Sequence, residues 1–232
     1  MNTLLLKAEL IKLRRNKLWL MIVMFAVLST AIPFCLFYYQ NGGTEGWRDL
    51  ILWGHAFAPF FLYTFTALFF YLIVSSEYNG LTWKVILTEP IKRKGILLSK
   101  WLIVNIALFI SLCLSAFFLG VAAYLLQLSF SLLDLLFYLF TLWLSSQAMV
   151  SILLVMSVKI ANGNLVIGIG ILSSLAYLFY NEQKWLPTSF PGWVVQEQGY
   201  SLEGALSFTL ISVLLGGLII FFTMKNFSKH EF

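Results

Sequence analysis

The sequence predicts an all-α integral membrane protein with six transmembrane helices. Its 232 residues are 60% hydrophobic and only 11% charged, whereas a soluble domain carries about 25% charged residues. The apolar residues form runs long enough to cross a bilayer, which takes about 20 residues per helix. The charged residues collect between these runs, so too few polar groups remain to cover a water-exposed surface. No repeat or change of composition divides the chain, and we expect one transmembrane domain over residues 1–232.

The predicted spans are the six apolar runs, taken in order along the chain. They cover residues 18–38, 51–74, 101–126, 132–158, 165–180 and 206–224. The fifth run is short, whereas the others are long enough to cross the membrane with some tilt. The first run does not resemble a cleaved signal peptide, because a segment with several charged residues, 1–17, precedes it and no small-residue cleavage site follows it. In the long outer connection, residues 181–205, Pro187 and Pro191 favour short helices or a partly re-entrant loop.

The Lys and Arg residues predict the orientation of these spans. With a cytoplasmic N-terminus, 13 of the 15 basic residues fall on the cytoplasmic side, and only Arg48 and Lys184 fall outside. Cytoplasmic loops of membrane proteins carry such an excess, so both termini are expected in the cytoplasm. Topology thus explains the net charge of +5, and no nucleic-acid partner is expected.

The connection between the second and third runs is charged and partly amphipathic. The stretch Tyr78–Thr88 suits a short helix, with Gly80 and Pro90 as its limits. Glu77 and Asn79 are placed to cap backbone groups near its start. Such a helix could dock on a soluble partner, although a loop that only sets the topology explains the segment equally well. The connection also carries basic residues that suit anionic lipid headgroups, namely Lys84, Lys92, Arg93, Lys94 and Lys100.

Small and polar residues mark two of the predicted spans. In the fifth run, Gly170 and Ser174 form a small-xxx-small pair, with Gly168 nearby. Close helix packing is the simpler role for this face, and a seam with a second membrane subunit beside the substrate path is the alternative. The fourth run contains a polar cluster that either makes hydrogen bonds between helices or lines a polar path, formed by Ser145, Ser146, Gln147 and Ser151.

Aromatic residues gather near the predicted outer ends of the spans. Trp53, His55 and Phe57 lie in the outer part of the second run, and Trp185 and Trp193 lie in the long outer connection. These residues could contact an amphipathic peptide. An interfacial aromatic belt without a transport role is the alternative.

The sequence lacks the motifs of an ATPase and of common hydrolases. No Gly-Lys pair occurs, which excludes a P-loop, and no catalytic or metal-binding constellation is found. Both aspartates, Asp49 and Asp134, lie near outer span ends. Intramembrane charges commonly mark ion coupling, so their scarcity argues against an ion-coupled carrier. The missing catalytic motifs argue against an enzyme. Cys35 and Cys113 lie in different spans and are expected to be buried and unpaired.

The cytoplasmic connection resembles the corresponding loop of ABC-2 type transporter permeases. The matching order is Glu77, Asn79-Gly80, Thr82, Leu87-Thr88, Pro90, Arg93 and Lys100. Leu81 separates Gly80 from Thr82, which departs from the adjacent Gly-Thr pair of the family. The resemblance implies a helix that couples to an ATPase, formed by Glu77, Tyr78, Asn79, Gly80, Thr82, Trp83, Leu87, Pro90 and Arg93. Residues 6–20 resemble the family's amphipathic interfacial helix, with the polar residues Glu9, Lys12, Arg14 and Arg15.

The resemblance also implies partners and a location. ATP and Mg would be bound by a separate ABC ATPase subunit in two copies, so this chain would hold no cofactor. A second permease, identical or related, would complete the transporter in a bacterial cytoplasmic membrane. Within the family, the chain is most similar to permeases of lantibiotic self-immunity transporters, which expel a membrane-active peptide from the producer's membrane. A membrane-embedded enzyme and a scaffold or sensor without transport remain as alternatives.

Overall fold

The computed structural model describes most of the chain as a bundle of helices. The described residues are 18–41, 46–79, 93–129, 131–160, 162–180, 183–198 and 202–227, and they contain no strand. Their helices are α2 (Leu18–Asn41), α3 (Trp47–Asn79), α5 (Arg93–Leu125), α6 (Leu132–Ser145), α7 (Gln147–Lys159), α8 (Gly163–Tyr180), α9 (Phe190–Gln198) and α10 (Leu202–Phe227). Six helical stretches are long and apolar enough to cross a membrane, with α6 and α7 together making one of them. The predicted fold class is therefore confirmed.

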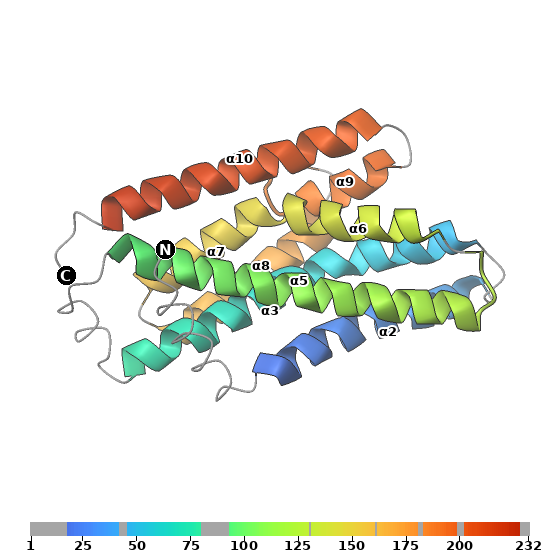
Figure 1. Cartoon of the computed structure of the whole chain (residues 1–232), viewed down its shortest axis with the longest axis horizontal. Coiled ribbons are helices and arrows are strands. Elements are labelled where there is room, and N and C mark those ends of the chain that lie inside the picture. Colours follow the sequence, from blue (N-terminus) through green and yellow to red (C-terminus); the bar gives the residue numbers. More distant parts are fainter. Residues whose placement is uncertain are drawn as a thin grey trace.

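The spans run alternately up and down the long axis of the bundle (Figure 1). The start of α2 and the end of α10 consequently lie at the same end, together with the end of α3 and the start of α5. We call this the basic end, because the lysines Lys94, Lys159 and Lys225 belong to helix termini there. We call the opposite end the distal end; Asp49, Asp134 and α9 lie there.

Helix α3 lies at the centre of the packing and contacts α2, α5, α7, α8 and α9. Its aromatic side chains pack against the neighbouring helices; for example, the rings of Phe25 on α2 and Phe65 on α3 meet edge to face, with centroids 5.5 Å apart. Helices α8 and α10 lie at the periphery, and only 22% of the spanning stretch of each is buried inside the bundle. Their exposed sides are rich in Leu, Ile and Phe, as expected of surfaces that face lipid.

The structure changes the predicted limits of the connection between the second and third spans. Helix α3 continues to Asn79. Tyr78 and Asn79, the first two residues of the helix predicted over Tyr78–Thr88, therefore belong to the last turn of α3. Helix α5 begins at Arg93 rather than at residue 101. Lys100, which was expected near lipid headgroups, is instead completely buried. The helical period explains this difference, because Lys100 shares the core-facing side of α5 with Ile96, Leu97, Ile103 and Val104, all of which are buried.

The fourth span, predicted over residues 132–158, is present over Leu132–Lys159, and it is interrupted at Ser146 between α6 and α7. One further expectation is wrong. Cys35 and Cys113 were expected to be buried, but both are exposed on the outside of the bundle, and both are free thiols. Amphipathic periodicity gives little guidance for such residues, because a helix in a membrane is apolar on its lipid-facing and core-facing sides alike.

Candidate functional site

The interruption of the fourth span is produced by a side chain from α10. The hydroxyl of Ser212 donates a hydrogen bond to the Ser145 carbonyl at 2.6 Å and accepts one from the Ala148 backbone N–H at 3.1 Å. In a continuous helix, the Ala148 N–H would pair with the carbonyl of Leu144. Insertion of a side chain into this ladder is a recognised cause of helix kinks, so Ser212 accounts for the break.

Helix α10 approaches the break through a narrow buried stripe that contains Ser212 and Gly216. Thr209, Ser212, Gly216 and Ile220 are its buried positions near the fourth span. A Cβ atom at Gly216 would lie 2.8 Å from the Gln147 carbonyl oxygen and 3.2 Å from the Ser151 hydroxyl. The glycine therefore lets the two backbones come together where the fourth span is interrupted.

Polar side chains of α5 and α7 form hydrogen bonds next to the break. The Gln147 side-chain amide donates to Asn105 Oδ1 at 2.8 Å and to the Trp143 carbonyl at 3.0 Å. Asn105 in turn donates to the Trp101 carbonyl at 3.0 Å. Gln147 is only 6% exposed, yet its side-chain oxygen has no hydrogen-bond partner. We call the set Asn105, Ser145, Gln147, Ser151, Ser212 and Gly216 the span-four joint.

Within the polar cluster predicted in the fourth span, the Gln147 side chain makes the expected hydrogen bond to another helix. The hydroxyls of Ser145, Ser146 and Ser151 instead bond carbonyls of their own span. The prediction missed Asn105 and Ser212, because each stands almost alone in an apolar run. Signals for them were present in the sequence: Ser212 and Gly216 have the same small-xxx-small spacing as Gly170 and Ser174. An asparagine inside a span, such as Asn105, is itself a sign of helix-to-helix hydrogen bonding.

The small face of α8 packs against α3 within this chain. A Cβ atom at Gly170 would meet the Cβ of Ala67 and would lie 3.2 Å from the Tyr63 carbonyl oxygen. One turn later, the hydroxyls of Ser174 and Thr64 are hydrogen-bonded at 2.8 Å. The predicted close helix packing is present, whereas a Cβ at Gly168 would meet nothing within 4 Å.

The segment before α10 folds back onto the distal end of the bundle. Helix α9 packs against α3, α6 and α10, and its residues Phe190 and Val194 are buried. The Tyr63 hydroxyl on α3 donates to the Thr188 carbonyl at 2.9 Å and ties this segment to the core. The sequence had left open short helices or a partly re-entrant loop, and the structure gives a short helix packed on the bundle.

The predicted aromatic residues make different contacts in the structure. Trp53 and Phe57 stack on α3 with centroids 6.5 Å apart; the side chain of His55 lies outside the described residues. Trp193 of α9 stacks on Phe208 with centroids 6.2 Å apart, and the Lys184 ammonium lies 4.3 Å above its ring. Trp185 is 75% exposed and donates to the Gln183 side chain at 3.1 Å.

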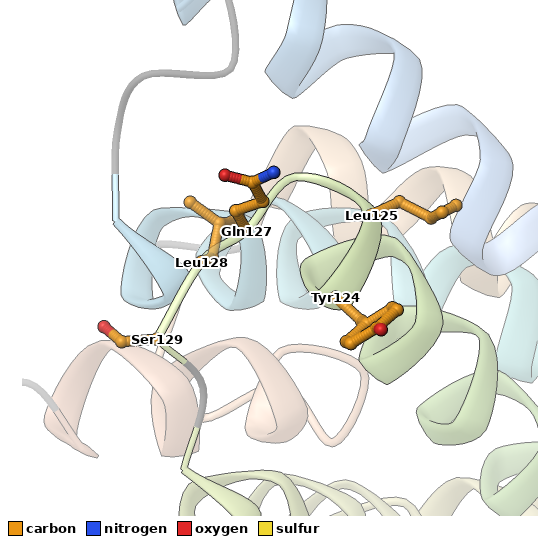
Figure 2. A pocket seen from close by; sticks show the side chains of 5 residues that line it. All are labelled: Tyr124, Leu125, Gln127, Leu128 and Ser129. Carbon is orange, nitrogen blue, oxygen red and sulfur yellow. The ribbon is translucent and has the colours of Figure 1, made fainter.

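Two hollows lie side by side near the distal end. One, of about 530 Å³, surrounds the turn between α5 and α6, where Tyr124, Leu125, Gln127, Leu128 and Ser129 line it (Figure 2). Figure 2 shows Leu125 extending toward α2. The other, of about 270 Å³, is an apolar groove between α2 and α5, which we call the α2–α5 groove; its lining is Val27, Thr30, Ala31, Phe34, Phe118, Val121, Ala122 and Leu125. Leu125 belongs to both.

The residues predicted to couple to an ATPase lie mostly outside the described residues. The backbones of Glu77, Tyr78 and Asn79 close α3, and that of Arg93 opens α5, but their side chains are not described. The other predicted coupling residues fall outside the described ranges, as do those of the predicted interfacial helix; they are Gly80, Thr82, Trp83, Leu87 and Pro90, and Glu9, Lys12, Arg14 and Arg15. Their roles stay predictions.

Comparison with known proteins identifies the family. A family model described as ABC-2 family transporter protein matches residues 5–181, which is 177 of the 232 residues. The match includes the first five spans and the whole connection between α3 and α5. No curated protein matches the chain. Members of this family are the transport subunits that cross the membrane, and their partner is an ABC ATPase. The chain therefore belongs to the ABC-2 transporter family and is the membrane-spanning permease subunit of an ABC transporter.

Proposed function

We propose that this permease exports an amphipathic or hydrophobic substrate, and that the substrate is a lantibiotic or a similar antimicrobial peptide from which the cell protects itself. The observation that carries this proposal is the α2–α5 groove. Its lining is apolar apart from Thr30, whose hydroxyl is already bonded to the Ala26 carbonyl at 2.8 Å. Because it lies on the outside of the bundle, a substrate dissolved in the bilayer could reach it without crossing water.

The hollow beside the groove adds a polar rim. At Leu125 the groove meets this hollow, whose lining includes Gln127 and Ser129 of the turn and Tyr124 at the end of α5. A surface with an apolar wall and a polar edge suits a molecule with one apolar and one polar side, as an amphipathic peptide has. The stacked pair Trp53 and Phe57 and the exposed Trp185 provide further aromatic surface in the outer half of the spans.

The few charged side chains inside the bundle support the proposal that the energy for transport comes from another subunit. Among the described side chains, the acids Asp49 and Asp134 lie at the distal helix ends, and Lys100 is the buried charged group of the spans. Ion-coupled carriers keep acidic or histidine relays inside the membrane. Transport would instead be driven by ATP and Mg bound to the partner ATPase, with no cofactor in this chain.

The proposed complex has two ATPase copies and a second permease, identical or related. The basic end would face the cytoplasm of a bacterium, because the lysines at the helix ends gather there, and both termini would lie on that side. The ATPases would push on residues 77–93 and rearrange the spans between inward-open and outward-open states. The outward face of α8, with Gly168, is the proposed seam with the second permease, since Gly170 and Ser174 are engaged by α3.

The first test identifies the partners. The tagged chain is extracted gently from its native membrane, and the proteins that purify with it are identified. The proposal expects a P-loop ATPase that is lost when residues 77–90 are scrambled, and a second, non-identical permease would favour the immunity-type complex. A complex without any ATPase would contradict the assembly and would favour a scaffold or an enzyme.

The second test addresses the substrate. Cells that lack the gene are complemented with variants and challenged with a panel of purified lantibiotics. Ala31→Trp would fill the α2–α5 groove, whereas Ile32→Trp adds the same side chain at an exposed position of α2 that does not line the groove. We expect only Ala31→Trp to lose protection. Equal protection by both variants, or no protection by the unmodified chain, would contradict the proposed substrate.

A further inference from the structure

We propose that the fourth span bends at the span-four joint during transport, and that Ser212 is the positioning residue that sets the bend. This inference concerns the permease activity itself and does not depend on the identity of the substrate. It begins from the position of the break: α6 reaches the distal end and contacts α9, whereas α7 reaches the basic end and contacts α8. A bend at Ser146 therefore moves α6, the half of the span at the distal end, relative to α7, the half at the basic end, which would face the ATPase.

The Ala148 N–H and the Ser145 carbonyl each have a second possible partner within the fourth span. In the observed conformation, Ser212 accepts from the Ala148 N–H and donates to the Ser145 carbonyl. If the span straightened, Ala148 N–H would regain the Leu144 carbonyl, and the Ser145 carbonyl would regain the N–H of Met149. Backbone groups in a membrane interior must stay paired, so a second set of partners is what permits two conformations.

On the side of the joint that faces α5, one buried polar atom lacks a hydrogen-bond partner. The buried side-chain oxygen of Gln147 has no donor, although the amide of the same side chain makes two hydrogen bonds. A buried acceptor without a partner costs free energy. Another arrangement of α6 and α7 in which this oxygen is paired would recover that cost, so the observed bend is not held by a fully satisfied network.

The absence of a side chain at Gly216 keeps the joint close to α10. Its ideal Cβ position is 2.8 Å from the Gln147 carbonyl oxygen, so Ser212 reaches the break only because α10 can approach this closely. The two residues lie one turn apart on the same stripe of α10. Movement of α10 relative to α7 would withdraw the Ser212 hydroxyl and release the bend.

The experiment measures the bend directly in the complex of this chain with its ATPase. The exposed native Cys35 and Cys113 are replaced by serine, and spin labels are placed at Leu133→Cys on α6 and Tyr39→Cys on α2, both exposed in the structure. Labelled chains are diluted with unlabelled chains, so that distances within one chain are recorded. A control pair joins Tyr39→Cys to Phe179→Cys at the distal end of the uninterrupted α8.

We expect the distance between positions 39 and 133 to shift by about 7 Å between the nucleotide-free and the ATP–vanadate-trapped complex, because a change of about 20° acts over about 20 Å of helix. The control pair should shift less. Ser212→Ala should remove the nucleotide-dependent shift, while ATP hydrolysis continues. Ser212→Thr, which keeps the hydroxyl, should restore the shift.

The matched control is Ser173→Ala on α8, which removes a hydroxyl bonded only within its own helix, to the Ile169 carbonyl at 2.8 Å. An unchanged distance between positions 39 and 133 in the unmodified joint would overturn the proposal, and this measurement does not depend on any variant of Ser212 folding. A shift that persists in Ser212→Ala as it does in Ser173→Ala would also overturn the role of Ser212.

Discussion

The close contact between α3 and α8 allows the effect of one added methyl group to be predicted. In Gly170→Ala, the new Cβ would occupy space held by the Ala67 Cβ and would lie 3.2 Å from the Tyr63 carbonyl oxygen. Neither of these atoms can rotate away, because one is fixed to the backbone and the other belongs to it. Carbon atoms pack at about 3.5–4.0 Å, so α8 has to move away from α3 by more than about 1 Å.

The cost of this displacement follows from two contributions. Overpacking in a well-packed interior costs about 1–3 kcal/mol. The movement also breaks the hydrogen bond between Thr64 and Ser174, now 2.8 Å long; such bonds between membrane helices contribute about 0.6 kcal/mol on average. We therefore expect the free energy of unfolding of Gly170→Ala to lie about 2–4 kcal/mol below that of Gly168→Ala.

Gly168→Ala is the matched control for this prediction. It makes the same change two residues away in α8, where the new Cβ would meet no atom within 4 Å. Both variants share the gain in helix propensity that replaces glycine by alanine, so the difference between them isolates packing. Unfolding in mixed micelles with increasing SDS, followed by tryptophan fluorescence, measures both. Equal stability of Gly170→Ala and Gly168→Ala would refute the packing argument.

Three other predictions address the distal turn, the distal segment and the ATPase contact. Gln127 lies two residues after the end of α5 and has φ 56°, a left-handed conformation that glycine adopts freely; Gln127→Gly should add about 1 kcal/mol of stability, and a lower thermal midpoint would contradict this. Tyr63→Phe removes the 2.9 Å hydrogen bond to Thr188, so amide exchange over residues 183–190 should rise about fivefold; unchanged exchange would mean that packing alone holds the segment. Glu77→Lys should abolish ATP-driven transport while membrane insertion, measured by the amount of chain in the membrane fraction, stays normal; transport at the unmodified rate would exclude the proposed coupling role.

Much of the candidate site was visible in the sequence as residue types, but not as partners. Gln147 and its serine neighbours stood out because polar groups in an apolar run need hydrogen bonds. Gly170 and Ser174 stood out because their spacing places them on one face of a helix. The acceptor Asn105 is 42 positions from Gln147, and the inserted Ser212 is 64 positions from Ala148. No local pattern links positions so far apart.

The sequence by itself determined the class of protein, the number of spans and the family. Each of these depends on local composition: apolar runs of bilayer length, basic residues between them, and the ordered residues of one connection. Only the tertiary structure decided where the fourth span breaks, which glycine of α8 meets a neighbour, and that Lys100 points into the bundle. In a membrane, the lipid-facing and core-facing sides of a helix are both apolar, so hydrophobic periodicity does not distinguish them. The neighbour that each side chain contacts makes that distinction, and the arrangement of the helices is what supplies the neighbour.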